Sequence, residues 1–171
     1  MNQIPEIIGT KAVLLAQIGR NPGIRYRELL RLTGLANGVL TYHLSGLEKA
    51  HHVNVERRSK MTRYYPLSVS ERESTILRYI RHEPVRRIVL FLLENEHCTF
   101  TEIVDHMKKA PSTISLHLKR LREDGVVSVR YGEYHLYRLS NRELVEDVLS
   151  MYRASFVDRV VDGYAEIMED L

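Results

Sequence analysis

The chain has 171 residues, of which 44% are hydrophobic and 27% charged, proportions typical of a folded globular protein rather than a disordered or fibrous one. No apolar run approaches the roughly 18 residues needed to cross a bilayer, and residues 1–30 lack the apolar core of a signal peptide, so we expect no membrane partner and a cytoplasmic location. A single cysteine, Cys98, cannot form an internal disulfide, which agrees with a reducing compartment.

The net charge of +3 is unevenly distributed along the chain. Residues 141–171 contain eight acidic residues against three arginines, a net charge of −5, which leaves +8 for residues 1–140. The basic residues 1–140 favour a polyanionic partner, whereas the acidic tail over residues 141–171 is expected to have a role other than polyanion binding.

Residues 1–69 predict a first domain of three helices and a hairpin. Apolar residues at helical spacing define the first helix, and a second short helix ends at the turn over residues 33–36. The third helix buries one stripe, and a hairpin of alternating residues follows it. The stripe consists of Leu40, Leu44 and Leu47, and the hairpin loop carries Arg57, Arg58, Lys60 and Arg63.

Residues 70–83 predict a linker helix. The segment begins with Ser70, followed three residues later by Glu73, which is the pattern of a capping box. We expect this helix to end before Pro84, because the residue that precedes a proline disfavours helical dihedral angles.

Residues 84–140 repeat the first domain at a shift of 74 positions, which becomes 72 at Leu67 and Leu139 because the first copy has two extra residues. His43 and Leu44 of the first copy correspond to His117 and Leu118 of the second. A capping box opens the second helix of this copy at Thr99, and Pro111 suits the first turn of its third helix. The predicted hairpin turns at residues 131–133 and carries little net charge.

Residues 141–171 predict a long amphipathic helix. Its apolar positions recur every three or four residues for about seven turns. They are Leu144, Val148, Met151 or Tyr152, Phe156, Val160, Tyr164, Ile167 and Leu171. The fold class is therefore mainly α with small β-hairpins (α+β): two tandem winged-helix domains, a linker helix and a long C-terminal helix.

Residues 38–48 and 111–121 resemble the recognition helices of ArsR/MarR-like winged helix-turn-helix regulators. The first copy, whose basic wing ends in Arg63-Tyr64-Tyr65-Pro66, is similar to regulators common in archaea. This resemblance covers roughly residues 10–68 and 85–140 and implies a transcriptional regulator that binds double-stranded DNA, located at the nucleoid. The chain lacks the cysteine pair that binds metal in the ArsR family. We expect no third, sensor-type domain, so the small-molecule effector stays open.

Major-groove recognition by a helix predicts which residues contact DNA, because only side chains on its exposed face reach base edges. Arginines of the first wing are expected on the phosphate backbone or in the minor groove. The expected contacts are Asn37, Gly38, Thr41, Tyr42, Ser45, Arg57, Arg58, Lys60 and Arg63 in the first copy, and Ser112, Thr113, Ser115, Leu116, Lys119, Arg120 and Arg130 in the second. We expect the first copy to dominate DNA affinity.

Other interpretations remain open from the sequence. Helix-turn-helix domains also serve as protein-interaction subunits of transcription or chromosome-organising complexes. The second copy either contacts DNA or mainly supports dimerisation. The tail over residues 141–171 either joins a homodimer or covers the core of its own chain.

Catalytic and metal-binding interpretations find little support in the sequence. Neither a phosphate-binding glycine loop, an HExxH helix nor a nucleophile elbow is present, so we expect no enzyme and no cofactor. The pairs His51-His52 and His97-Cys98 lack the further ligands that close a metal site, and we expect no metal.

Overall fold

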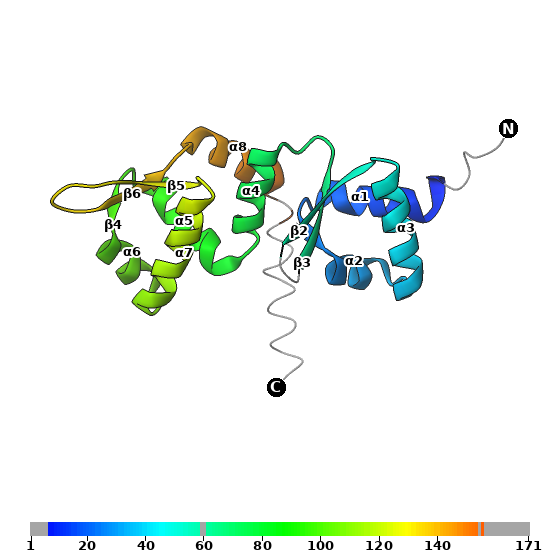
Figure 1. Ribbon diagram of the computed structural model, residues 1–171, viewed down its shortest axis with the longest axis horizontal. Coiled ribbons are helices and arrows are strands. Elements are labelled where there is room, and N and C mark those ends of the chain that lie inside the picture. Colours follow the sequence, from blue (N-terminus) through cyan, green and yellow to red (C-terminus); the bar gives the residue numbers. More distant parts are fainter. Residues whose placement is uncertain (1–6, 59–60, 154, 156–171) are drawn as a thin grey trace. The chain divides into compact units, whose positions relative to one another are not determined.

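The computed structural model describes residues 7–58, 61–153 and 155, which form two compact units (Figure 1). Unit 1 comprises the described residues up to Ser74 and from Tyr152 onward, and unit 2 comprises residues 75–151. The division between the units falls within the predicted linker helix.

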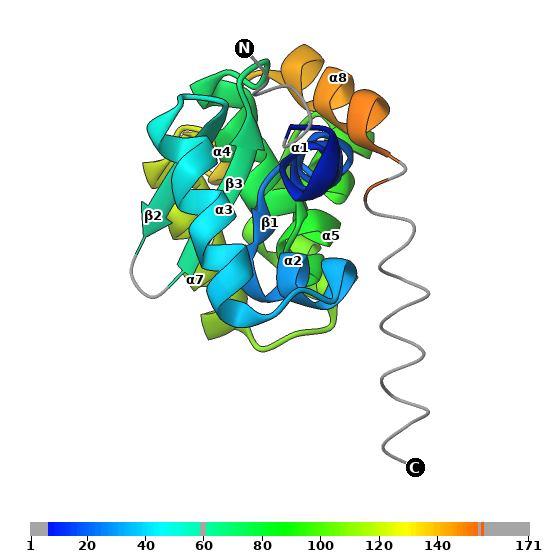
Figure 2. The same ribbon diagram turned by 90° about the vertical axis from the view of Figure 1, so that its right-hand side faces the viewer.

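Unit 1 consists of helices and a three-stranded antiparallel sheet. Its strand order is β1-β3-β2, so β3 occupies the centre of the sheet. Figure 2 shows the β2–β3 hairpin beside α3. The elements are a short π-helical turn η1 (Ile7–Lys11), α1 (Ala12–Arg20), β1 (Ile24–Arg25), α2 (Tyr26–Thr33), α3 (Asn37–Lys49), β2 (Val53–Arg58) and β3 (Met61–Pro66). The buried core is Leu14, Ile18, Ile24, Leu29, Leu40, Leu44, Leu47, Val53 and Tyr64.

Unit 2 repeats this arrangement with strand order β4-β6-β5. In Figure 1 its β5–β6 hairpin, drawn in yellow, projects beyond the helices of the unit. Helix α4 (Glu71–Ile80) begins in unit 1 and continues into unit 2. The further elements are α5 (Glu83–Glu94), β4 (Cys98–Thr99), α6 (Phe100–Met107), α7 (Pro111–Glu123), β5 (Val127–Arg130), β6 (Leu136–Leu139) and α8 (Arg142–Tyr152).

The predicted repeat and the α+β tandem fold are confirmed. Helices α3 and α7 begin and end at positions that correspond in the repeat, and so do the short strands β1 and β4. The same capping contact recurs at the start of the second helix, where the Glu28 carboxylate accepts from the Arg25 amide at 2.9 Å and the Glu102 carboxylate from the Thr99 amide at 2.7 Å. The two-residue strands β1 and β4 were not predicted, because so short a strand carries no readable alternation.

The predicted linker and tail helices differ in extent from α4 and α8. The Ser70–Glu73 capping box is present, with the Ser70 amide 2.7 Å from the Glu73 carboxylate, but α4 ends at Ile80 and α5 begins at Glu83. Helix α8 ends at Tyr152, and residues 156–171 of the predicted tail helix lie outside the described residues. Among the described helices, none is long and apolar enough to cross a membrane.

The turn between the second and third helices requires a left-handed residue in both units. Gly34 adopts φ 63° at the end of α2, and Lys108, its counterpart in the repeat, adopts φ 50° at the end of α6. Glycine adopts this conformation without strain, whereas other residues incur a steric cost.

Gly34→Ala is expected to lower the free energy of unfolding by about 1 kcal/mol, because a Cβ is disfavoured at positive φ. A Cβ at Gly34 meets nothing within 4 Å, so the effect is conformational and not a clash. Gly19 is the matched control, since it lies exposed in α1 with the same open space. Gly19→Ala should stabilise by roughly 0.5–1 kcal/mol. Urea unfolding measures the change in unfolding free energy for both variants. Changes of the same sign would contradict the conclusion that the left-handed conformation of Gly34 causes the effect.

Candidate nucleic-acid interface

Helix α3 presents a continuous polar face to solvent. It buries Leu40, Leu44 and Leu47, and at about 100° per residue the residues predicted to contact bases fall in an arc of about 140° beside this stripe. All of them are exposed, and Tyr42 is the most prominent with 72% of its surface accessible. They are Asn37, Gly38, Thr41, Tyr42 and Ser45.

The N-terminus of α3 is held by Tyr26, the first residue of α2. The Tyr26 hydroxyl lies 2.6 Å from Asn37 Oδ1, 3.0 Å from the Asn37 carbonyl oxygen and 2.9 Å from Thr41 Oγ1. Two of the predicted base-facing side chains are thereby fixed in one orientation. Tyr26 was not predicted as a functional residue. The available signal was a difference between the copies, because its counterpart Phe100 has no hydroxyl.

Tyr26→Phe is expected to reduce discrimination between cognate and mismatched duplexes by roughly fivefold, because Asn37 and Thr41 lose the bonds that orient them. Affinity for non-cognate duplexes should stay constant, since no phosphate contact is removed. Tyr134→Phe is the control, because it removes an exposed hydroxyl that no described residue contacts. Duplex competition titrations measure the ratio. An equal loss for every duplex would refute an orienting role.

The wing of unit 1 is basic in sequence, but its arginines are paired with glutamates. Arg57 Nη1 and Nη2 each donate to an oxygen of the Glu48 carboxylate at 2.6 Å, which joins β2 to the end of α3. The hydrogen bonds from Arg57 hold the pKa of Glu48 below its usual range. Arg58 lies 3.1 Å from Glu56. Both arginines are exposed, while Lys60 lies outside the described residues.

Arg63 does not lie at the wing tip, contrary to expectation. Only 5% of its surface is exposed, and its Nη1 donates to the Gly23 carbonyl oxygen at 2.9 Å. Burial lowers the pKa of this guanidinium. The reason for the error is β1, which pairs Arg25 with Arg63 and makes β3 a central strand rather than an edge. We therefore leave Arg63 out of the proposed DNA surface.

Helix α7 repeats the exposed face in unit 2. It buries Ile114, Leu118 and Leu121. All the predicted contacts on this helix are exposed, and Lys119 lies 3.9 Å from the carboxylate of Glu123. The predicted contacts are Ser112, Thr113, Ser115, Leu116, Lys119 and Arg120.

The C-terminal end of α7 is fixed by a cluster that the sequence did not reveal. Tyr79 of α4 donates to the Asp124 carboxylate at 2.5 Å and lies 3.0 Å from the Arg120 carbonyl oxygen, and Arg78 lies 2.7 Å from Asp124. Burial, followed by the bond to Asp124, raises the pKa of Tyr79 to about 12. These three contacts at one end hold α7 in a fixed position.

The wing of unit 2 is aromatic rather than basic. Tyr131 and Tyr134 are each 66% exposed between β5 and β6, and Arg122 of α7 donates to the Tyr131 hydroxyl at 3.2 Å. Arg130 is exposed, and no described acidic residue pairs with it. Wing 2 therefore carries fewer cations than wing 1, but its Arg130 is not offset by a glutamate.

The histidines of the two third helices differ in their surroundings. His117 faces His82 at 5.6 Å between ring centroids, and burial, reinforced by His82 and Arg120, lowers the pKa of His117. His43 instead meets the Tyr42 ring edge-on at 5.3 Å. Within the described residues, no group of three or more histidine, cysteine or acidic side chains is arranged to hold a metal ion.

Both halves of the chain match known helix-turn-helix families. Residues 9–77 match a family described as an N-terminal HTH domain, and residues 83–129 match the family described as bacterial regulatory protein, arsR family. An uncharacterized HTH-type transcriptional regulator of Methanocaldococcus jannaschii is 29% identical over 126 residues, which cover 74% of this chain. The match spans 27% of that relative's length, about a quarter.

Two solved structures show partial similarity. HlyU from Vibrio cholerae is 26% identical with a TM-score of 0.42, covering 48% of this chain and 90% of its own. The transcriptional repressor BigR from Xylella fastidiosa is 24% identical with a TM-score of 0.42, covering 47% of this chain and 83% of its own.

Proposed function

We propose that this chain, which carries two helix-turn-helix domains, the second similar to the arsR family of bacterial regulatory proteins, is a transcriptional regulator that binds double-stranded DNA sequence-specifically in the cytoplasm. The observation that carries the proposal is the exposed face of α3, which lies beside a buried leucine stripe and whose first turn is held by Tyr26. A helix with such a face fits the major groove.

Base reading is assigned to the α3 face and phosphate binding to the wing. Tyr42 is large, exposed and central on this face, so it suits contact with a thymine methyl group. Arg57 and Arg58 suit phosphates, because a guanidinium fork that grips a carboxylate also fits a phosphate. To bind DNA, Arg57 must then exchange the Glu48 carboxylate for a phosphate. This exchange lowers the free energy that Arg57 contributes to DNA binding.

Unit 2 supplies a second reading helix. Its face differs from that of α3, with Leu116 and Lys119 where unit 1 has Tyr42 and Ser45, so the two units read different bases. Lys119, Arg120 and Arg130 are assigned to phosphates.

The protein acts as a homodimer joined chiefly through residues 141–171. The sequence supports this proposal, because the apolar stripe of this segment is far longer than a winged helix needs to close its core. Its net charge of −5 makes the segment a poor DNA contact and leaves it free for a protein one. In a two-fold dimer, the DNA-binding surface of each protomer, which we call its reading head, then faces one half of a two-fold-symmetric operator.

Duplex titrations at several salt concentrations test the proposed function. We expect log affinity to fall linearly with log salt, with a slope of about −0.9 for each phosphate contacted. Genomic fragments that contain the chain's own promoter are the first substrates, and a single strand of the same sequence is the control. Failure to bind any fragment at low salt would instead favour a protein-interaction subunit.

A further inference from the structure

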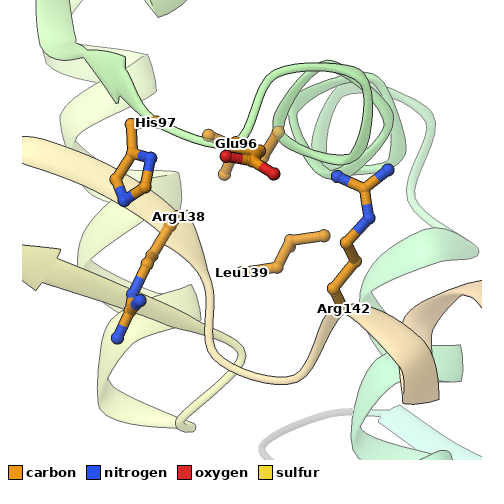
Figure 3. Close-up of a pocket in the computed structure, with 6 residues that line it drawn as sticks. Glu96, His97, Arg138, Leu139 and Arg142 are labelled. Atoms are coloured by element: carbon orange, nitrogen blue, oxygen red, sulfur yellow. The ribbon is translucent and has the colours of Figure 1, made fainter.

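A pocket of about 260 Å³ lies in unit 2, and its lining includes none of the residues assigned to DNA (Figure 3). It lies where the end of α5 and the segment after it meet the β6–α8 turn. Leu92 and Leu139 provide an apolar lining and are buried. The remaining lining residues are polar or charged: Glu96, His97, Arg138 and Arg142.

The two arginines are anchored in a way that leaves their ends available. Arg138 Nε donates to Ser128 Oγ at 3.3 Å, and Arg142 Nε donates to Glu146 Oε1 at 2.9 Å. Each of these hydrogen bonds uses Nε. Among the described residues, none accepts a hydrogen bond from Nη1 or Nη2 of either arginine, so these atoms can donate to a ligand. No described residue hydrogen-bonds or pairs with the side chain of Glu96 or His97.

The charges around the pocket define what it can hold. Two guanidinium groups match two carboxylates, because the planar fork of arginine fits a carboxylate bidentately. The Glu96 carboxylate repels an additional anionic group of a ligand and attracts a cationic one, such as an ammonium group. In Figure 3 this carboxylate lies between Arg142 on one side and Arg138 with His97 on the other.

We propose that this pocket binds a small dicarboxylate that carries an amino group, the chemistry of an acidic α-amino acid. The carboxylates contact Arg138 and Arg142, the ammonium group contacts Glu96, and the short carbon chain rests on Leu92 and Leu139. His97 adds a hydrogen-bonding nitrogen beside Arg138.

A ligand in this pocket would connect the wing of unit 2 to α8. Arg138 lies on β6, which pairs with β5 from Val127 to Arg130, while Arg142 is the first residue of α8. The ligand thus ties the first turn of α8 to the sheet that carries the wing. This regulatory step rests on the proposed function: holding the start of α8, where the proposed dimerisation segment begins, against the sheet favours the DNA-binding form and raises DNA affinity.

Methyl NMR on the full chain tests the site without DNA. L-aspartate at millimolar concentration should shift the methyl signals of Leu92 and Leu139, and succinate, which lacks the amino group, should bind roughly tenfold more weakly. Glu96→Gln should reverse this preference, because it removes both the ammonium partner and the repulsion of succinate. Arg138→Gln with Arg142→Gln should abolish the shifts, and Arg87→Gln, an exposed arginine of α5 outside the pocket, should leave them unchanged.

Three outcomes would overturn the site: no methyl shift with L-aspartate, an unchanged shift in the double arginine variant, or equal binding of inorganic phosphate. The substituted side chains are exposed, so the variants should fold, and their amide spectra check this. DNA titration with and without L-aspartate then tests regulation. Ligand binding with unchanged DNA affinity would refute the effector role alone, whereas absence of DNA binding would refute the proposed function and leave the ligand site standing.

Discussion

A chain that ends at Ser155 is expected to be monomeric and to bind a two-fold-symmetric duplex about a hundredfold more weakly than the full chain. In the dimer, binding of one reading head places the second at a high effective concentration near its half-site. Loss of the connection removes this gain without changing any contact between a single head and DNA. The truncated chain should therefore bind an isolated half-site as well as the full chain does.

The position of this truncation follows from α8. Val145 and Val148 are 1% exposed, so removal of the whole helix would expose a packed face and confuse dissociation with unfolding. Light scattering measures the oligomeric state of both chains. A full chain that is monomeric at micromolar concentration contradicts the proposal, and so does a truncated chain that stays dimeric.

Arg57→Ala combined with Arg58→Ala is expected to weaken binding to every duplex by one to two orders of magnitude. The variant loses two phosphate contacts, so the magnitude of the salt slope should fall by about two. Tyr42→Ala should instead lower discrimination at one base pair by roughly 1–3 kcal/mol and leave the salt slope unchanged.

Glu48→Gln is the matched control for the wing arginines. It frees Arg57 from its carboxylate partner without adding or removing a phosphate contact, so affinity should rise while the salt slope stays unchanged. If Glu48→Gln weakened binding, the carboxylate would position Arg57 for DNA and not compete with it. If the arginine variant and Tyr42→Ala both lowered affinity uniformly, Tyr42 would not read bases.

The helices and their buried stripes were predictable from the sequence, because each domain buries one face of each helix. Leu40, Leu44 and Leu47 recur at helical spacing in the first copy, and Ile114, Leu118 and Leu121 repeat that spacing in the second. The exposed face of α3 follows from the same periodicity by exclusion. The periodicity thus located the exposed face, and the resemblance of residues 38–48 to recognition helices marked it as the candidate reading surface.

The side-chain contacts were not predictable, because they depend on strand order and on partners distant in sequence. Arg63 was interpreted as a wing cation since nothing in the sequence marks β1, which converts β3 into a central strand. The Arg57–Glu48 pair joins residues nine positions apart across a helix and a strand. Tyr26 and Asn37 belong to different helices, and only the packing of α2 against α3 brings the Tyr26 hydroxyl to the helix start.

The most direct test of sequence-specific DNA binding is selection from a library of genomic fragments with the full chain, followed by sequencing. We predict enrichment of one motif, and Tyr42→Ala should change or relax the base preference at some of its positions. Fragments recovered in proportion to their abundance, with the same result for Tyr42→Ala, would contradict the claim that α3 reads DNA sequence.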